Sequence, residues 1–441
     1  MLSLGDKTEL FVDDYLIEKS ENIELDILRP ERREVVFKID TKIEGNVSAY
    51  HSVVTIPETG QVYLYYRTNH GFALAISDDG IHFERANDLR LYPEIKDIKN
   101  MVFRGMPADH NFAPVYDDNP DCPKEQKFKA IGFNGWPNAK LVAFSSPDGI
   151  HWKLMREEPI ITEGMFDSLN TAFWDKSAGV YRCYSRYFKK TEEEKKIVKN
   201  LDNFAADVGK RAIQSCTSVD FLDWTKPVPN TYNGVEAPFH FYTNSIRTVP
   251  GAEHILVGFP MRFSDERKKV DEHVEGGVSD CVFISSRDGK EWTMRDSRPW
   301  IYPGIDKRQW TERNFQVSAG FVDKNDEFSF YVINSYHWDD EYIVRYTIPK
   351  HRFGYAYSKK GEFLTKPFIL NGNVLTFNYN TSAIGTLTVN VVNENGEPVK
   401  NHCYEMYGNE IAHPIDLSDL KGEKLRLKIK LEDAFLYAIS C

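Results

Sequence analysis

Short apolar runs that begin with a polar residue recur along the first three-quarters of the chain. Each is followed by a turn and an aromatic strand, as at residues 62–67 and 180–184. Runs of this length, bounded by turn residues, predict β-strands, because helices need longer stretches with a period of 3.6 residues. The runs occupy residues 50–54, 111–115, 170–174, 244–248 and 314–318. This pattern predicts a mainly β protein built from repeated strand–turn–strand units.

A turn motif recurs with the same spacing. Its pattern, Ser-x-Asp-Gly-x-x-Trp/Phe, is read at Ser77, Ser146, Ser218 and Ser286, so the copies lie about 70 residues apart. In such a turn glycine takes a positive φ, while the Ser and Asp side chains bind the amides of the turn itself. We therefore interpret the aspartates of the motif as structural and leave them out of the active site.

Units of this length are longer than the blades of about 40 to 45 residues in WD-type propellers, and five of them reach residue 350 or so. They predict an all-β fold with a five-bladed β-propeller over residues 1–354. The later segments 374–379, 387–391 and 425–431 alternate between apolar and polar residues. They predict a small C-terminal β-sandwich over residues 355–441.

Two charged stretches, residues 191–208 and 264–277, interrupt the β pattern. We expect helical or mobile insertions there. Their charges are explained by a solvated face, and a loop over the binding mouth is the functional alternative.

Composition and charge narrow the function classes. The net charge of -11 argues against a nucleic-acid partner, which needs basic faces. No apolar run approaches the roughly 18 residues of a membrane span, and no basic-then-apolar segment opens the chain. Six scattered cysteines without paired spacing favour reduced thiols and a cytoplasmic location, although removal of an export signal would leave the same sequence. We expect no cofactor and no metal.

Polar residues at the starts of the inner strands are the candidate functional groups, because these ends converge on the central channel of a propeller. The candidate catalytic carboxylates are Glu44, Asp109, Asp167 and Glu312. The candidate substrate-binding residues are His51, Arg104, His110, Asn111, Asn170, Tyr242, Asn244, Arg313 and Asn314. Carboxylates among hydrogen-bonding neutral groups suit a carbohydrate and the acid–base cleavage of its glycosidic bond. In the alternative interpretation, these residues only cap strand amides and solvate a channel.

The immediate sequence context suggests how the carboxylates differ. His110 follows Asp109 and Arg313 follows Glu312, and a neighbouring cation lowers the pKa of a carboxyl. Asp167 has no such neighbour, so we expect its pKa to be raised. Tyr50, Trp136 and Trp310 could offer aromatic faces to a sugar, but packing explains each of them equally well.

Several segments carry a resemblance to a known superfamily. They are residues 10–17 (Leu-Phe-Val-Asp-Asp-Tyr-Leu-Ile), 109–114 (Asp-His-Asn-Phe-Ala-Pro), 166–170, 279–286 and 310–314. On these segments the chain resembles the five-bladed propeller glycoside hydrolases of families 32, 43, 62 and 68. It is most similar to bacterial proteins labelled family 32 N-terminal-like. The fructosidase signatures W-x-N-D-P-N-G and R-D-P are absent.

The resemblance implies a funnel-shaped site with one carboxylate from each of the first three blades. By position, Glu44 would be the nucleophile or base, Asp109 the modulator and Asp167 the general acid. It also implies that residues 10–17 form the outer strand that closes the last blade, which makes Asp13 and Asp14 structural. The C-terminal sandwich would buttress the propeller, and pairing into a homo-oligomer stays open.

Three functions are left to separate. The first is a glycoside hydrolase acting on an oligo- or polysaccharide, with Asp167 as acid and Glu44 or Glu312 as its partner. The second is a glycoside phosphorylase, in which Arg104, Arg262, Arg313 and His273 would hold phosphate. The third is a carbohydrate-binding propeller without catalysis.

Overall fold

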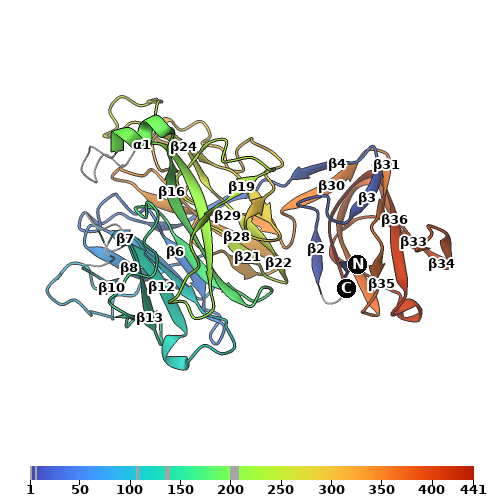
Figure 1. Ribbon diagram of the computed structural model, residues 1–441, viewed down its shortest axis with the longest axis horizontal. Coiled ribbons are helices and arrows are strands. Elements are labelled where there is room, and N and C mark those ends of the chain that lie inside the picture. The colour runs from blue at the N-terminus through green and yellow to red at the C-terminus, as the bar shows by residue number, and fades with distance from the viewer. Residues whose placement is uncertain are drawn as a thin grey trace.

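The computed structural model describes residues 2–4, 7–105, 108, 110–133, 135, 140–198 and 208–441. Within these ranges the chain is almost entirely strand and turn, which confirms the mainly β prediction. The helix α1 (Glu192–Val198) is short, and single turns of 3₁₀ helix cover Lys124–Gln126, Lys307–Gln309 and Ser418–Leu420. Figure 1 shows two parts, a larger body of several sheets and a smaller one that contains both chain ends.

Three antiparallel sheets follow one another along the first half of the chain. Their strands are in chain order, except that β9 and β10 of the first sheet both pair with β8. The first sheet contains β6 (Ser52–Thr55), β7 (Val62–Thr68), β8 (Gly71–Ser77), β9 (Glu84–Arg85) and β10 (Met101–Phe103). The second contains β11 (Phe112–Tyr116), β12 (Phe128–Phe133), β13 (Leu141–Ser146) and β14 (Lys153–Leu154). The third contains β15 (Thr171–Asp175), β16 (Val180–Lys189), β17 (Lys210–Ser218) and β18 (Val228–Pro229). Each is one strand–turn–strand unit of the predicted kind.

The fourth unit is divided among three small sheets. One contains β21 (Arg247–Val249), β22 (Ala252–Gly258) and β25 (Ile284–Ser286). Another contains β20 (His240–Phe241), β23 (Met261–Ser264) and β24 (Val278–Cys281). In the third, β19 (Thr231–Tyr232) pairs with β26 (Glu291–Trp292). The division falls at Pro260, which has no N–H to give to the ladder. Its carbonyl still accepts from the Val282 amide at 3.1 Å, so the two larger pieces remain one interrupted hairpin.

The last sheet of the larger body is closed by a strand from the beginning of the chain. Its order is β27-β28-β29-β5, with bounds β27 (Val322–Lys324), β28 (Glu327–Asn334), β29 (Tyr342–Pro349) and β5 (Glu31–Lys38). The prediction that residues 10–17 close this sheet is therefore wrong. Val36 and Phe37 of β5 pack into the same core as Ile343 of β29, whereas β2 (Thr8–Leu10) pairs elsewhere.

Hydrogen bonds connect each unit to the next and the last unit back to the first. They run from Tyr65 Oη to Gly149 O, from Asn111 Nδ2 to Ser168 O, from Asn244 Nδ2 to Leu169 O, from Ser245 Oγ to Val317 O and from Val53 N to Ala319 O. The contacts thus form a closed circuit, which brings the starts of the inner strands to a common centre.

The smaller part is an 11-stranded sheet that combines both ends of the chain (Figure 1). Its strands are β1 (Leu2–Ser3), β2, β3 (Ile17–Glu21), β4 (Glu24–Ile27), β30 (Gly354–Ser358), β31 (Gly361–Thr365), β32 (Phe368–Ile369), β33 (Val374–Asn393), β34 (Pro398–Met406), β35 (Asn409–Asp416) and β36 (Lys424–Ser440). In β36, buried and partly exposed residues alternate, so one face of this strand packs on the core. The predicted 355–441 module therefore also takes strands from the first 27 residues.

The repeated turns have the structural role that the sequence predicts. In the second copy, Asp148 Oδ1 accepts from the amides of Ile150 (2.8 Å) and His151 (2.9 Å) and from Ser146 Oγ (3.0 Å). The glycines of three copies, Gly80, Gly149 and Gly289, have φ values of +77°, +76° and +80°. Phe221 takes this position in the third copy with φ +70°, and its buried ring packs on Tyr181, which offsets the strain.

The segment around Asp13 joins the smaller part to the fourth unit. Asp13 accepts two hydrogen bonds from the Arg287 guanidinium, at 2.7 and 3.0 Å, and Glu9 accepts a third at 2.9 Å. The guanidinium carbon also lies 3.8 Å from the centre of the Tyr15 ring. Asp13 is therefore structural, as expected.

The two charged insertions differ from each other. Helix α1 lies within the 191–208 stretch, of which residues 199–207 fall outside the described residues. Residues between β23 and β24 form an irregular connection rather than a helix. In the part of the chain that the structure covers, no helix is long and apolar enough to span a bilayer.

The six cysteines are free thiols, and Cys122, Cys183, Cys216 and Cys281 are buried. Cys183 faces Cys216 across β16 and β17. Burial raises the pKa of the Cys183 thiol well above its ordinary value, which keeps it protonated and unreactive. This agrees with the reduced thiols that the spacing predicts.

Candidate active site

A cavity of about 510 Å³ opens where the first, second and fifth units meet. It is lined by Val47, Arg67, Thr68, Asn69, His70, Gly71, Arg104, His110, Arg313, Tyr336 and His337. Three arginines and three histidines face it, and none of the lining residues is a carboxylate. We call this cavity the central pocket.

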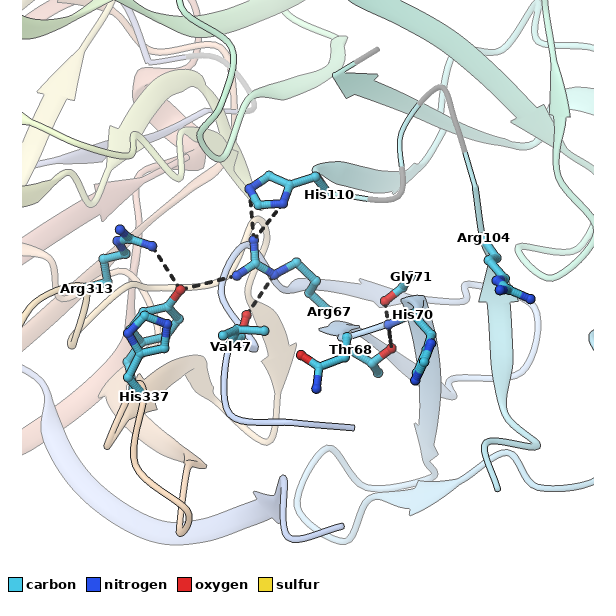
Figure 2. Close-up of a pocket in the computed structure, with 11 residues that line it drawn as sticks. Val47, Arg67, Thr68, His70, Gly71, Arg104, His110, Arg313 and His337 are labelled. Atoms are coloured by element: carbon cyan, nitrogen blue, oxygen red, sulfur yellow. Dashed lines mark hydrogen bonds between the residues drawn. The ribbon is translucent and has the colours of Figure 1, made fainter. Parts of the chain in front are cut away.

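Arg67 is the hub of the central pocket, as Figure 2 shows. It lies near the end of β7 and is 5% exposed. Its guanidinium donates to Val47 O (2.7 Å) and to the Tyr336 hydroxyl (3.2 Å), and it lies 3.1 Å from His110 Nε2. Arg313 donates to the same Tyr336 hydroxyl at 3.0 Å. These bonds fix the cationic groups relative to one another.

Asp167 is the carboxylate at the edge of this cluster. Its Oδ1 lies 2.9 Å from His110 Nε2, and its side chain is 31% exposed. Burial by itself would raise the pKa of Asp167, but the bond and charge of His110, with the charges of Arg186 and Arg67, outweigh it. The pKa of Asp167 is therefore held well below its ordinary value. The prediction of a raised pKa is wrong, because the cations come from other strands and not from sequence neighbours.

Aromatic rings separate the cations around Asp167. The Arg186 guanidinium lies 4.8 Å and that of Arg313 lies 5.8 Å from the centre of the Tyr242 ring. Arg67 stands 5.2 Å from the centre of the Tyr50 ring. Burial, together with nearby Tyr242 and Asp167, raises the pKa of Tyr50, so this hydroxyl stays neutral. Tyr50 and Tyr242 therefore form a buried wall rather than exposed stacking faces.

Backbone strain gathers at the same place. Tyr50, Arg313 and His337 have φ values of +64°, +55° and +65°, in a region that non-glycine residues seldom occupy. Such strain costs about 1–3 kcal/mol per residue and persists where the surroundings hold it. Gln316 holds Tyr50 by accepting from its amide at 3.0 Å. Clustered strain of this kind is typical of functional sites.

Glu312 is placed behind the lining residues. It is 2% exposed, and its two oxygens lie 2.9 Å from Arg313 Nε and 3.0 Å from His337 Nδ1. Glu312 thus positions two residues that line the pocket. The structure brings it close to the centre without exposing it.

Glu44 has all its acceptor positions filled below the pocket. It accepts from the Tyr66 hydroxyl (2.5 Å), from Thr41 Oγ1 (2.6 Å) and from Arg85 at 2.8 and 2.9 Å. Burial would raise the pKa of Glu44, but these bonds lower it on balance. Glu44 does not line the pocket, and its assignment as nucleophile or base stays a prediction from the sequence.

Most of the predicted substrate-binding residues hold the inner strands together. All five are buried and bond to backbone carbonyls: His51, Asn111, Asn170, Asn244 and Asn314. Burial lowers the pKa of His51 to about 4, so its ring is neutral. Buried strand ends need such partners, because an unpaired carbonyl there is costly. This is the capping role of the alternative interpretation.

Other candidates fall into two groups, those that line the pocket and those outside the described residues. His110, Arg104 and Arg313 line the pocket, and Arg104 also donates to Glu94 at 2.9 Å. Asp109 and Trp136 lie outside the described residues.

The predicted phosphate-binding set does not converge. Arg104 and Arg313 share the central pocket, but Arg262 forms a two-pronged ion pair with Asp280 elsewhere. His273 is buried between the carbonyls of Glu275 and Tyr336. Within the described part of the chain, no group of three or more His, Cys, Asp or Glu side chains is placed to hold a metal ion.

Sequence reasoning missed Arg67, Arg186, Tyr336 and His337. A signal was available for the two arginines, since each lies two residues after a tyrosine, Tyr65 or Tyr184, in the second strand of its unit. Each Nε donates to a carbonyl just before an inner strand, Arg67 to Val47 (2.7 Å) and Arg186 to Met165 (3.1 Å). The repeated position indicates a shared role at the centre.

No family model and no curated protein matches the chain. Solved structures do match it. An N-acetylgalactosamine deacetylase from F. plautii, in complex with blood group B trisaccharide, is 15% identical, with a TM-score of 0.48 over 75% of this chain and 96% of that one. A family 32 β-fructofuranosidase from Bombyx mori is 8% identical, with a TM-score of 0.46 over 92% and 93% of the two chains. An endo-arabinase from Bacteroides thetaiotaomicron is 10% identical, with a TM-score of 0.44 over 72% and 98%.

All three are at most 15% identical to the chain, and their TM-scores lie below 0.5.

Proposed function

We propose that this chain is a carbohydrate-active enzyme that cleaves glycosidic bonds, on a five-bladed β-propeller followed by a β-sandwich. The closed circuit of contacts among its sheets supports the propeller. The observation that carries the function is Asp167, a partly exposed carboxylate 2.9 Å from His110 at the edge of a pocket surrounded by fixed polar groups. Glycosidic cleavage passes through a positively charged, oxocarbenium-like transition state, which a nearby carboxylate stabilises.

The lowered pKa of Asp167 decides between its two roles. A general acid must hold a proton near neutral pH, whereas a nucleophile, base or electrostatic stabiliser must be ionised. Asp167 is ionised, so it acts as nucleophile, base or stabiliser in this proposal, and not as the acid. His110 and Arg67 position it, because His110 contacts both side chains.

The acid partner follows by elimination among the sequence candidates. Glu44 is buried and accepts four hydrogen bonds from Tyr66, Thr41 and Arg85. Glu312 is buried within 3.0 Å of Arg313 and His337, so neither carboxylate is free to reach a glycosidic oxygen. Asp109 precedes His110 in the chain and is the remaining candidate. Its role rests on the sequence alone.

The test is product release from a panel of aryl glycosides and oligosaccharides, furanosides included. We expect Asp167→Asn to lower turnover on the order of 10³-fold or more, because the amide cannot replace the negative charge. Asp88→Asn, an exposed carboxylate elsewhere, is the matched control and should leave turnover unchanged. Turnover that survives Asp167→Asn would refute the assignment. Tight binding without any product would instead favour a non-catalytic carbohydrate-binding propeller.

A second candidate function, glycoside phosphorolysis, is favoured by the cations of the central pocket. Arg67, Arg104 and Arg313 face it with three histidines and without an opposing carboxylate among the lining residues. Arginine is suited to bind phosphate through paired N–H donors. The same panel run with and without inorganic phosphate separates the two reactions. A phosphorylase requires phosphate, and Arg104→Met should then raise the phosphate KM about tenfold.

A further inference from the structure

A second cavity, of about 490 Å³, lies on the fourth unit and is separate from the central pocket. We call it the lateral cavity. It is lined by Pro238, Phe239, His240, Arg262, Phe263, Ser264, Asp265, Glu266, Arg267, Val278, Ser279, Asp280, Pro303 and Trp310. These residues come from β20 and the two residues before it, from β23 and β24, from the connection between β23 and β24, and from the segment before Arg313.

The lining combines flat apolar faces with a fixed polar pair. Phe239, Phe263 and Trp310 supply aromatic rings. Arg262 binds Asp280 through two hydrogen bonds of 2.9 and 2.6 Å, donates to Ser297 O at 2.8 Å, and lies 4.8 Å from the centre of the Phe239 ring. The side chains of Arg262 and Asp280 are 22% and 18% exposed, so part of each remains open to a ligand.

This combination matches the chemistry of a sugar. A sugar ring presents an apolar C–H face, which loses contact with water against an aromatic ring, and a rim of hydroxyls that both donate and accept. Arg262 offers donors only, whereas the Asp280 carboxylate offers acceptors. A neutral polyhydroxylated ligand satisfies both. The cavity is lined by three carboxylates and two arginines, Arg262 and Arg267, so it offers an anion no net attraction.

The lateral cavity shares a wall with the central pocket. Trp310 lines the lateral cavity and Arg313 lines the central pocket. Because these residues are three positions apart in the chain, their Cα atoms can be at most about 11 Å apart. Between these residues lies the buried Tyr242 ring, whose centre is 5.8 Å from the Arg313 guanidinium carbon and 5.5 Å from that of Arg211. Arg211 in turn contacts Asp265 of the lateral cavity at 3.1 Å. The two linings share no residue, so a ligand that occupies both cavities has to pass over this wall.

We infer that the lateral cavity is a distal saccharide subsite, which binds a sugar unit of the same oligosaccharide whose cleaved bond lies at Asp167. This inference rests on the proposed function, since it places the reacting unit in the central pocket. Binding of remote units supplies energy that positions the reacting bond. Longer substrates are thus cleaved more efficiently than short ones.

The first experiment compares kcat/KM for aryl monosaccharide glycosides and for ladders of oligosaccharides from disaccharide to hexasaccharide. We expect Phe239→Ala and Asp280→Asn each to lower kcat/KM for the longer members about tenfold, a loss of about 1.4 kcal/mol, and to leave the aryl glycosides unchanged. Tyr407→Ala, an exposed aromatic on the smaller part, is the matched control. The inference would be overturned if the variants lost kcat/KM equally on short and long substrates. It would also be overturned if the wild-type kcat/KM did not rise with substrate length.

The second experiment separates this inference from the proposed function. Wild-type protein and Phe239→Ala are applied to a printed array of plant, algal and microbial oligosaccharides. Length-dependent binding that Phe239→Ala abolishes, without turnover of any glycan, would support the subsite and refute catalysis. Turnover without length dependence would support catalysis and refute the subsite. Absence of both turnover and array binding would refute both.

Discussion

At the residue scale, the centre of the molecule depends on side chains that reach across from neighbouring units. Asp167 precedes β15 of the third unit, His110 precedes β11 of the second, and Arg67 belongs to β7 of the first. His110 lies between the other two, 2.9 Å from Asp167 and 3.1 Å from Arg67. The charge state of Asp167 is therefore set by three units together.

His110 controls the pH dependence in this arrangement. In the proposed role Asp167 is active when ionised, so on the acid side activity falls as the pH drops through its lowered pKa, below the ordinary value of 3.8. His110→Asn removes the strongest lowering influence and leaves the cost of burial, which raises the pKa. We expect the acid limb of the kcat/KM profile to move up by about one unit or more.

The matched control for this prediction is His82→Asn. His82 forms a similar ion pair with Asp79 at 2.7 Å, in the repeated turn between β8 and β9 of the first unit. It should leave the acid limb in place. An unmoved acid limb in the His110 variant would show that His110 does not hold the Asp167 charge.

Glu341 is a buried carboxyl that the sequence did not single out. Its Oε2 accepts from the Ser48 amide at 3.0 Å, and burial raises its pKa to about 8 from an ordinary 4.5. Between these pH values the folded protein keeps a proton that the unfolded chain releases. The free energy of unfolding therefore falls as the pH rises through this window.

Glu341→Gln should stabilise the protein, because the amide carries no charge to bury and can still accept from Ser48. We expect the free energy of unfolding to rise by up to about 4 kcal/mol near pH 8 and to change little near pH 5. Thermal melts at both pH values measure this difference. Glu158→Gln, at an exposed position, should change neither melt. An equal effect at both pH values would contradict the raised pKa.

At the element scale, the repeated turns and the N-terminal link were predicted with unequal success. Turn chemistry is local, so the role of the motif could be inferred from the residues in it. The partner of an N-terminal strand is not local, and both residues 10–17 and β5 carry apolar residues that could close a sheet. Only the packing of Phe37 and Ile343 in one core selects β5.

Asp148→Ala should weaken the second turn. The carboxylate accepts from two amides and from Ser146, and its loss leaves these donors unpaired at a cost of about 1–2 kcal/mol. Burial would raise the pKa of Asp148, but the N–H groups of His151 and Ile150 and the His151 ring lower it to about 2. The stabilisation is therefore present above the ordinary pKa of 3.8 and is lost as the pH falls toward 2.

Urea unfolding of Asp148→Ala at neutral and acidic pH measures this effect. The difference from the wild type should narrow as the pH falls. Asp88→Ala is the control and should cost less than about 0.5 kcal/mol. A difference that stays constant with pH would mean that the carboxylate charge is not what holds the turn.

Arg287 is the main ionic link between β2 and the fourth unit. Arg287→Ala would leave the buried Glu9 carboxylate with His254 as its remaining partner in a bond of 3.0 Å. Removing one member of a buried ion pair costs about 3–5 kcal/mol. Arg298→Ala is a matched control, because Arg298 also joins the two parts through Asp26 but is largely exposed. Arg298→Ala should lower the free energy of unfolding by about 1 kcal/mol or less. If urea unfolding showed equal losses of this free energy for the two variants, the burial of the Glu9–Arg287 pair would not explain the effect.

At the scale of the whole molecule, the two chain ends hold one sheet together. Strands β1 to β4 pair with β30, β31, β32 and β36, while β5 closes the last sheet of the larger body. The first 38 residues therefore contribute to both parts. This topology makes folding of the smaller part depend on residues at opposite ends of the chain, whose pairing has a high entropic cost.

A chain that begins at Leu28 tests this dependence. We expect it to aggregate or to melt in two separate transitions, because it exposes the edges of β30 and β31 and loses the Glu9 and Asp13 bonds to Arg287. Calorimetry and size-exclusion chromatography detect both outcomes. A soluble monomer with an unchanged single transition would show that β1 to β4 are dispensable.

The sequence by itself determined the β class, the repeated units and the role of the turns. These features depend on strand periodicity and turn chemistry, which act within a few residues. Tertiary structure decided which polar strand-start residues face the pocket and which, like Asn244 and His51, hold strands together. It also decided that Asp167 is ionised. Both depend on partners such as His110, Arg67 and Arg186, which lie far away in sequence and meet only when the circuit of sheets closes.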